Sequence, residues 1–220
     1  MLDIDPHSTG NRFRAKRFAL FRTLLDEVMA KKPSGAPCRI LDIGGTAGYW
    51  QAFGADIPWD RVSLTLTNLT AQEATCASVE TVVADARSMP GFADGSFDIV
   101  HSNSVIEHVG KWRDMMAMAG EVRRLAPAYF VQTPYFWFPI EPHARTPFVQ
   151  FLPEPLRYRL FMLRRNGFYA KAGTVSHAME MIQDASLLDR SQMRALFPDA
   201  DIRAERAFGL IKSLIAIRRP

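Results

Sequence analysis

A short apolar run followed by closely spaced glycines, at residues 39–50, constrains the fold of this chain most strongly. Ile40, Leu41 and Ile43 form the kind of apolar run that makes a strand buried on both faces. Three glycines follow it: Gly44, Gly45 and Gly48. Glycines adopt backbone conformations that other residues avoid, and their missing side chains let a ligand lie against the main chain. A buried strand, a glycine turn and a helix start predict a nucleotide-binding corner in an open α/β sheet.

The details of this corner exclude two common phosphate sites. It has no Gly-Lys-Ser/Thr sequence, so it is not the P-loop that holds nucleotide phosphates. Its glycine spacing also differs from the Gly-x-Gly-x-x-Gly pattern of dinucleotide-binding folds. Asp42 stands two residues before the first glycine. Its carboxylate would repel a pyrophosphate and would suit a ligand with a cationic amino acid end.

The corner resembles motif I of the class I S-adenosylmethionine-dependent methyltransferases, whose pattern is acid-x-Gly-x-Gly-x-Gly. Asp42, Gly44 and Gly48 are in register with that pattern, and Thr46 replaces its middle glycine. The resemblance implies S-adenosylmethionine as the cofactor. It places these residues among the cofactor contacts: Asp42, Gly44, Gly45, Thr46 and Gly48. It also implies a Rossmann-like α/β fold whose seven-stranded sheet is mostly parallel, with an antiparallel last strand and helices on both faces.

Two positions after later strands extend the resemblance. Residues 61–66 read as a strand ending near Asn68, where the family carries an acidic residue that accepts hydrogen bonds from the ribose hydroxyls. Asn68 can accept through its amide oxygen but lacks the charge. A third strand over 80–84 precedes Asp85 and Ala86, a stretch similar to motif II of the family. The resemblance assigns Asp85 to the adenine amino group, although Asp is also a common turn former.

A second long match runs from Gly95 to Val109. Residues 97–100 read as a fourth strand, and the segment looks like the Phe-Asp-Val to Glu-His-Val signature of small-molecule methyltransferases. We expect Ser102 and Asn103 to line the methionine portion of the cofactor, and Asn103 or Ser104 to cap the next helix. The loop lacks the Asn/Asp-Pro-Pro-aromatic sequence of enzymes that methylate exocyclic amines of bases, which disfavours that chemistry.

Histidines and cysteines in the sequence give no metal signal. His101 and His108 lack metal-ligand spacing and are interpreted as structural residues. The two cysteines, Cys38 and Cys76, also lack such spacing, so we interpret them as free structural thiols. No metal site is therefore expected.

Length and composition indicate a single domain over residues 1–220. No apolar run approaches a membrane span, and the start shows no signal-peptide pattern, so we expect a cytoplasmic enzyme. The net charge of +4 is too small to argue for nucleic acid by itself.

The remaining predicted elements complete an alternating α/β pattern. A helix over 11–32, capped by Ser8 or Thr9, carries an apolar stripe interleaved with basic residues. Those cations are either solvated or reach the cofactor carboxylate or an anionic acceptor. Further helices are predicted over 111–125, 155–165 and 175–183 and after Asp189, and further strands over 128–133, 201–207 and 210–218.

An irregular insertion at about residues 134–190 separates the fifth strand from the last two. Its first part, 134–148, is rich in proline and aromatic residues and predicts a rigid loop. The loop either forms the acceptor pocket, with Tyr135, Trp137 and Glu141 as contacts, or covers the core. The following apolar and basic helix is compatible with an active-site cover, a membrane surface or an oligomer contact.

The sequence thus predicts methyl transfer to an oxygen or nitrogen of a small-molecule or lipid-like acceptor. A hydroxyl acceptor needs a base, for which His143 beside Glu141 is the candidate; a role in holding the loop is the alternative. Two other classes stay open: a methyltransferase of RNA or protein, and a cofactor-binding homologue without catalysis. Acceptor identity and oligomeric state are not predicted.

Overall fold

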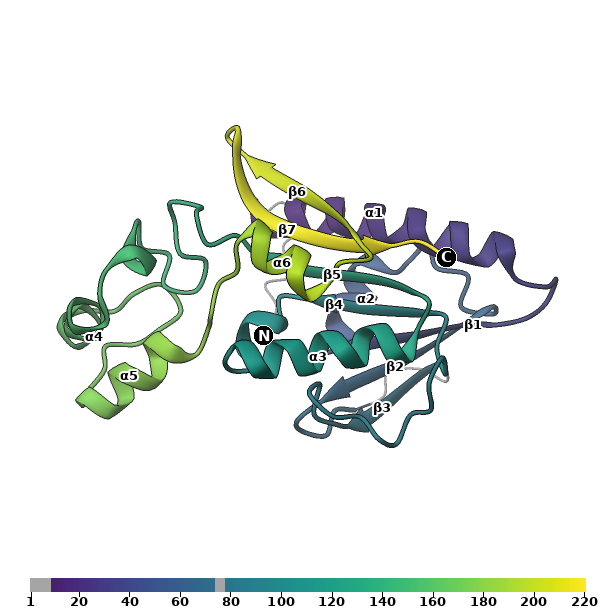
Figure 1. The fold of residues 1–220 in the computed structure, drawn as a ribbon, viewed down its shortest axis with the longest axis horizontal. Coiled ribbons are helices and arrows are strands. Elements are labelled where there is room, and N and C mark those ends of the chain that lie inside the picture. The colour runs from purple at the N-terminus through teal and green to yellow at the C-terminus, as the bar shows by residue number, and fades with distance from the viewer. Residues whose placement is uncertain (1–8, 74–77) are drawn as a thin grey trace.

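The computed structural model describes residues 9–73 and 78–220, in which seven strands form one sheet of order β3-β2-β1-β4-β5-β7-β6 (Figure 1). The strands are β1 (Cys38–Ile43), β2 (Val62–Asn68), β3 (Val79–Val83), β4 (Ile99–Asn103), β5 (Ala128–Pro134), β6 (Asp201–Ala207) and β7 (Leu210–Arg218). β1 to β5 are parallel, whereas β7 lies between β5 and β6 and is antiparallel to both. The predicted sheet, with its antiparallel last strand, is confirmed.

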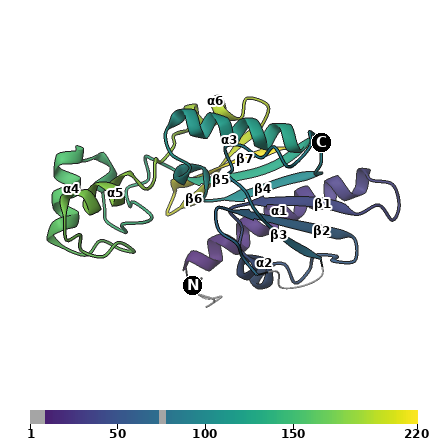
Figure 2. The ribbon, with the colours of Figure 1, turned by 90° about the horizontal axis from the view of Figure 1, so that it is seen from below.

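Helices cover both faces of the sheet, as predicted (Figure 2). α1 (Thr9–Lys31) and α2 (Ala47–Phe53) pack on one face, and α3 (Trp112–Leu125) and α6 (Arg190–Leu196) pack on the other. Each face has its own apolar cluster, because β1, β4 and β5 are buried on both sides and their alternate side chains point to opposite helical layers.

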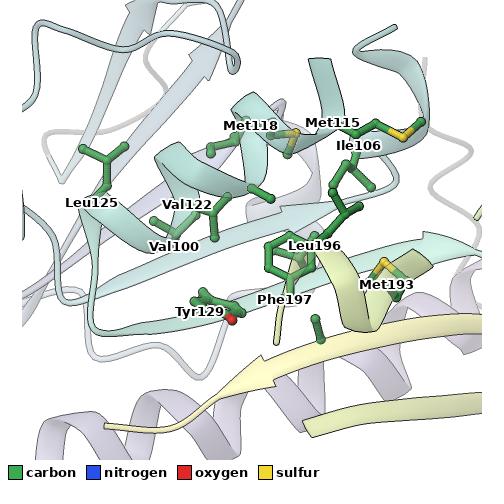
Figure 3. Packing of buried hydrophobic residues seen from close by; sticks show 14 of the residues in the cluster. Val100, Ile106, Met115, Met118, Val122, Leu125, Tyr129, Met193, Leu196 and Phe197 are labelled. Atoms are coloured by element: carbon green, nitrogen blue, oxygen red, sulfur yellow. The ribbon is translucent and has the colours of Figure 1, made fainter. Parts of the chain in front are cut away.

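α3 illustrates how the sequence pattern produces this packing (Figure 3). Its buried residues recur at helical spacing and form one stripe against the sheet and α6: Met115, Met118, Ala119, Val122 and Leu125. At its start, the Asp114 carboxylate accepts a hydrogen bond from the Lys111 backbone N–H at 2.9 Å. This bond satisfies a donor at the helix start, and the Asp114 charge suits the positive end of the helix dipole.

The segment after β4 differs from the prediction. β4 begins at Ile99, two residues later than expected, and extends to Asn103. Ser104 then adopts a left-handed backbone with φ of 58°, and its hydroxyl donates to Gln132 Oε1 at 2.9 Å. Only a short 3-10 helix, η1 (Ile106–His108), follows, and no side chain caps it. The predicted cap at Asn103 or Ser104 is therefore wrong, because the Ser104 hydroxyl donates its hydrogen bond to Gln132 of β5 instead of capping a helix.

The insertion lies beyond the carboxyl end of β5, apart from the helical layers in both views (Figures 1 and 2). It contains η2 (Val149–Phe151), α4 (Glu154–Leu163) and α5 (Val175–Gln183), close to the predicted helices. A separate small core holds it together: Ala144, Val149, Phe161, Ala172, Ala178 and Ile182. The insertion thus stands at the edge of the sheet where parallel strands end and ligands bind.

Three smaller predictions concern thiols, a helix cap and membrane spans. Cys38 is buried and free, and burial raises the pKa of its thiol to about 12, so it stays unreactive.

Cys76 and the candidate cap Ser8 lie outside the described residues. Among the helices of the described residues, none has the length and apolar character needed to cross a membrane.

Candidate active site

The strand order reverses between β1 and β4, which are neighbours in the sheet but lead to connections on opposite faces. Such a switch point opens a crevice at the carboxyl ends of the strands. Ile43 pairs with Ser102 in the register of β1 and β4, so the loops after the two strands start side by side. Two cavities meet at these loops, and Gly44 and Ser104 line both of them.

The glycine corner requires glycine at two positions for different reasons. Gly44 has a φ of +71°, and a Cβ atom there would lie 2.5 Å from Val105 Cγ2. A Cβ atom at Gly45 would lie 1.9 Å from Asp42 Oδ2. Thr46, which replaces the family's middle glycine, is the N-cap of α2, and its hydroxyl oxygen accepts from the Tyr49 backbone N–H at 3.4 Å. Thr46 thus has a structural role of its own.

Asp42 is a buried anchor with 1% of its surface exposed. Its carboxylate accepts from Trp50 Nε1 at 2.6 Å and lies 2.8 Å from His101 Nδ1. Since a carboxylate can only accept, the His101 proton is on Nδ1. The His101 ring stacks between Tyr49 and Phe130. Asp42 does reach the smaller cavity, but its strongest partners are protein groups rather than a ligand.

We therefore expect Asp42→Ala to destabilise the fold by about 2–4 kcal/mol, because it leaves two buried donors unpaired. Urea denaturation followed by circular dichroism measures this change. The matched control is Asp60→Ala, which removes an exposed carboxylate and should change stability by less than about 0.5 kcal/mol. Equal stability of the two variants would contradict the anchoring role.

The smaller cavity, of about 210 Å³, has the polar groups that an amino acid end requires. Arg14 and Arg17 of α1 line it. Their position supports the interpretation that basic residues of this helix reach the cofactor carboxylate or an anionic acceptor, rather than being solvated. Arg17 is buried, and its Nε lies 3.8 Å from Glu205 Oε1. Asn103 also lines this cavity, and its amide oxygen is buried without a hydrogen-bond partner among the described residues. Cations for a carboxylate and an acceptor for an ammonium group therefore share one cavity.

The larger cavity, of about 520 Å³, brings Gly44, Asn68, Asp85 and Ala86 together. Asn68 donates from Nδ2 to the Gly45 carbonyl at 2.7 Å, which leaves its Oδ1 as an acceptor. The Asp85 carboxylate accepts from Arg87 Nη2 at 2.6 Å, and these hydrogen bonds lower its pKa. Sequence reasoning missed Arg87, which also lines the cavity, because a cation two residues after an acid carries no motif.

The predicted base lies in a chain of three polar side chains. His143 Nδ1 is 2.7 Å from Glu141 Oε1, and His143 Nε2 is 3.1 Å from His108 Nε2. Burial lowers the pKa of His143, but the hydrogen bond and negative charge of Glu141 outweigh this effect and raise the pKa above its ordinary value. His108 lines the larger cavity, so it connects His143 to that cavity.

Glu107 lies beside the two histidines of this chain. It is 1% exposed, and its Oε2 accepts from Thr133 Oγ1 at 3.0 Å. Burial raises the pKa of the Glu107 carboxyl above its ordinary value. Sequence reasoning treated His108 as structural and gave Glu107 no role; the Glu-His-Val signature was the signal that could have drawn attention to both.

Comparison with known proteins identifies the domain. Residues 34–127 match the family model described as a methyltransferase domain. Residues 34–127 are therefore a methyltransferase domain. A search of curated proteins finds no match for this methyltransferase.

Solved structures share its fold at low sequence identity. The CurJ carbon methyltransferase aligns with a TM-score of 0.54 and 14% identity, over 87% of this chain and 51% of that chain. The methyltransferase thus spans about half the length of that structure. The EvdMO1 N-terminal domain, crystallised with S-adenosylhomocysteine and D-fucose, aligns with a TM-score of 0.53 and 18% identity, over 94% and 82% of the two chains. The PH0226 protein from Pyrococcus horikoshii OT3 aligns with a TM-score of 0.54 and 17% identity, over 99% of this chain and 93% of that chain.

Two of the predicted cofactor residues, Gly48 and Ser102, line neither of the two cavities at the glycine corner. Ser102 is fully buried and its hydroxyl donates to the Ile43 carbonyl at 3.2 Å, so it joins β4 to β1. Gly48 lies in the first turn of α2. Ser102 and Gly48 thus belong to the strand and the helix that hold the glycine corner in place.

The predicted acceptor contacts are separated in the insertion. A cavity of about 220 Å³ there is lined by Glu141, Phe136 and Gln150, among others, but by neither Tyr135 nor Trp137. Trp137 is 60% exposed and stacks on Phe151. Tyr135 packs against the sheet core instead. A turn begins at Tyr135, where the Phe138 backbone N–H donates to the Tyr135 carbonyl at 3.1 Å, so these neighbouring side chains do not line one cavity together.

Proposed function

We propose that the methyltransferase transfers a methyl group from S-adenosylmethionine to an oxygen, or a nitrogen, of a small-molecule or lipid-like acceptor. One observation carries this proposal: the bare main chain of Gly44 lies between two cavities of suitable polarity. A ligand extended past Gly44 would have its purine near Asp85, its ribose near Asn68 and its amino acid end near Arg14 and Asn103. A side chain at Gly44 would also collide with Val105, which lines the larger cavity, so only a glycine leaves both cavities as they are.

The residues of the chain then act by positioning and by proton removal. When bound, S-adenosylmethionine supplies an electrophilic methyl group on a positively charged sulfur. In-line transfer gains mainly from alignment of the acceptor, which the crevice between β1 and β4 would provide. His143 would take the proton of an acceptor hydroxyl on Nε2, while Glu141 holds its Nδ1 and stabilises the charge that forms.

Product formation tests this activity. The protein is incubated with S-adenosylmethionine and either the lipid fraction or the polar small-molecule fraction of a cell extract, and S-adenosylhomocysteine is quantified by chromatography. We expect acceptor-dependent turnover with one of these fractions. Turnover only with an RNA or protein fraction would overturn the assignment of the acceptor class.

An observation in the insertion favours a lipid-like acceptor. Residues 137–168 expose several large apolar side chains: Trp137, Phe148, Phe151, Leu152, Leu156, Leu163 and Phe168. Phe148 and Trp137 both contact Phe151, so part of this surface is continuous. Arginines accompany it, including Arg145, which stacks over Phe168 with 4.2 Å between its guanidinium carbon and the ring centroid. Apolar side chains with cations beside them suit an anionic lipid surface.

We therefore expect the protein to bind vesicles that contain anionic lipid and to release them at high salt. The double variant Leu163→Ser/Phe168→Ser should lower the bound fraction at least about fivefold, because both side chains are more than 60% exposed. Phe208→Ser is the matched control, since Phe208 is 98% exposed in the β6–β7 turn. Vesicle sedimentation measures binding, and an equal loss in both proteins would argue against this surface. We also propose that the protein is located in the cytoplasm.

A further inference from the structure

His108 and His143 face each other with nitrogens that both have lone pairs. His108 Nδ1 is 3.0 Å from the Asp184 backbone carbonyl, and His143 Nδ1 is 2.7 Å from Glu141 Oε1. Both partners can only accept, so each ring has its proton on Nδ1. The two Nε2 atoms, 3.1 Å apart, are then both acceptors. Two lone pairs at this distance repel each other unless a proton or a cation lies between them.

Glu107 adds a third ligand atom to the pair. One carboxylate oxygen and one ring nitrogen of each histidine all lie within 4.8 Å of one another. Glu107 Oε2 accepts from Thr133, but Oε1 is buried and has no hydrogen-bond partner among the described residues. A buried carboxylate oxygen without a partner is costly, and a cation at the cluster would satisfy it together with both ring nitrogens.

We propose that Glu107, His108 and His143 bind a divalent transition-metal ion of the Zn²⁺ type. Two imidazoles and one carboxylate form a ligand set that suits such ions, whereas Mg²⁺ and Ca²⁺ prefer oxygen ligands. At metal–nitrogen distances of about 2.1 Å, two nitrogens on one ion are about 3.0–3.4 Å apart. The observed separation of 3.1 Å is within that range, so only the Glu107 carboxylate has to move closer.

The outer partners of the two histidines are those that metal ligands have. Glu141 and the Asp184 carbonyl each hold one ring through its Nδ1–H, which fixes the ring and directs Nε2 at the cluster. Sequence spacing gave no sign of this site, because Glu107 and His108 follow β4 whereas His143 belongs to the loop after β5. The parallel pairing of those two strands brings the loops together.

The metal site does not depend on the proposed methyl transfer, but it bears on it. His108 lines the larger cavity, so the ion would lie at the wall of that cavity. An ion on His143 Nε2 would occupy the lone pair that the proposed base uses. Turnover measured with and without the ion therefore separates the two roles of His143.

Titration calorimetry tests the proposal on untagged full-length protein treated with a chelator and then dialysed. We expect one Zn²⁺ per chain, no heat with Mg²⁺, and a visible absorption band when Co²⁺ is added. His108→Ala and His143→Ala should each lower Zn²⁺ affinity more than about 100-fold, and Glu141→Gln, an outer partner, about 10- to 100-fold. The control His177→Ala removes an exposed histidine of α5 and should leave affinity unchanged.

Nitrogen chemical shifts of the wild-type imidazoles give a readout that needs no variant. Zn²⁺ should shift two Nε2 resonances and leave the corresponding Nδ1–H groups protonated. The proposal is overturned if the wild type binds no Zn²⁺, as when the pair shares only a proton, or if both alanine variants bind as tightly as the wild type. S-adenosylhomocysteine titrated into the same protein tests the cofactor site separately, so failure of one proposal is not failure of the other.

Discussion

Gly44→Val is expected to abolish binding of S-adenosylhomocysteine, with a loss in affinity of at least about 100-fold, or more than about 2.7 kcal/mol. The new Cβ atom would lie 2.5 Å from Val105 Cγ2, so the valine would displace Val105, which lines the larger cavity. The ligand can then no longer lie against the main chain. Calorimetric titration of both proteins with S-adenosylhomocysteine measures the effect.

Backbone strain is the competing explanation, because valine at a φ of +71° costs about 1–3 kcal/mol wherever it occurs. Gly35→Val separates the two effects. Gly35 has a φ of +79°, and a Cβ atom there meets nothing within 4 Å. This control should lose similar stability in urea but bind S-adenosylhomocysteine as the wild type does. If Gly44→Val keeps wild-type affinity, the cofactor does not lie at this corner.

His143→Ala is expected to lower turnover by about 10²- to 10⁴-fold, the usual contribution of a general base. Affinity for S-adenosylhomocysteine should stay within about twofold, because His143 lines neither cavity at the glycine corner and reaches the larger one only through His108. The measurement is kcat at saturating cofactor with the fraction that supports turnover in the wild type.

Two further proteins complete this experiment. His177→Ala, in the exposed histidine of α5, should turn over at the wild-type rate. Glu141→Gln keeps the size of the side chain but removes the charge behind His143, so a smaller loss is expected. A wild-type rate in His143→Ala would assign His143 to holding the loop.

Sequence reasoning succeeded where the signal is local. The strands and helices of the sheet region follow from apolar spacing, as α3 shows with its stripe from Met115 to Leu125. The glycine corner was predictable because Gly44 needs glycine for its own backbone conformation, with a φ of +71°. It also follows a buried strand, at the edge of the sheet where ligands bind. The order of the last two strands followed from the family resemblance rather than from any local feature.

The features that sequence reasoning missed depend on partners distant in sequence. Asp42 lines the smaller cavity and stays a predicted cofactor contact, but its hydrogen-bond partner His101 comes from β4, 59 residues later. Ser104 was expected to cap a helix, but Gln132 of β5 holds its hydroxyl. The cluster of Glu107, His108 and His143 forms only when the loops after β4 and β5 meet. No pattern within a short window contains these pairs.

The most direct test of the central claim is a crystal structure with S-adenosylhomocysteine bound. We predict density across Gly44, with the purine within hydrogen-bond distance of Asp85 and the amino acid end between Arg14 and Asn103. Density at another place in the molecule, or a purine on the Asp42 side of Gly44, would contradict the account.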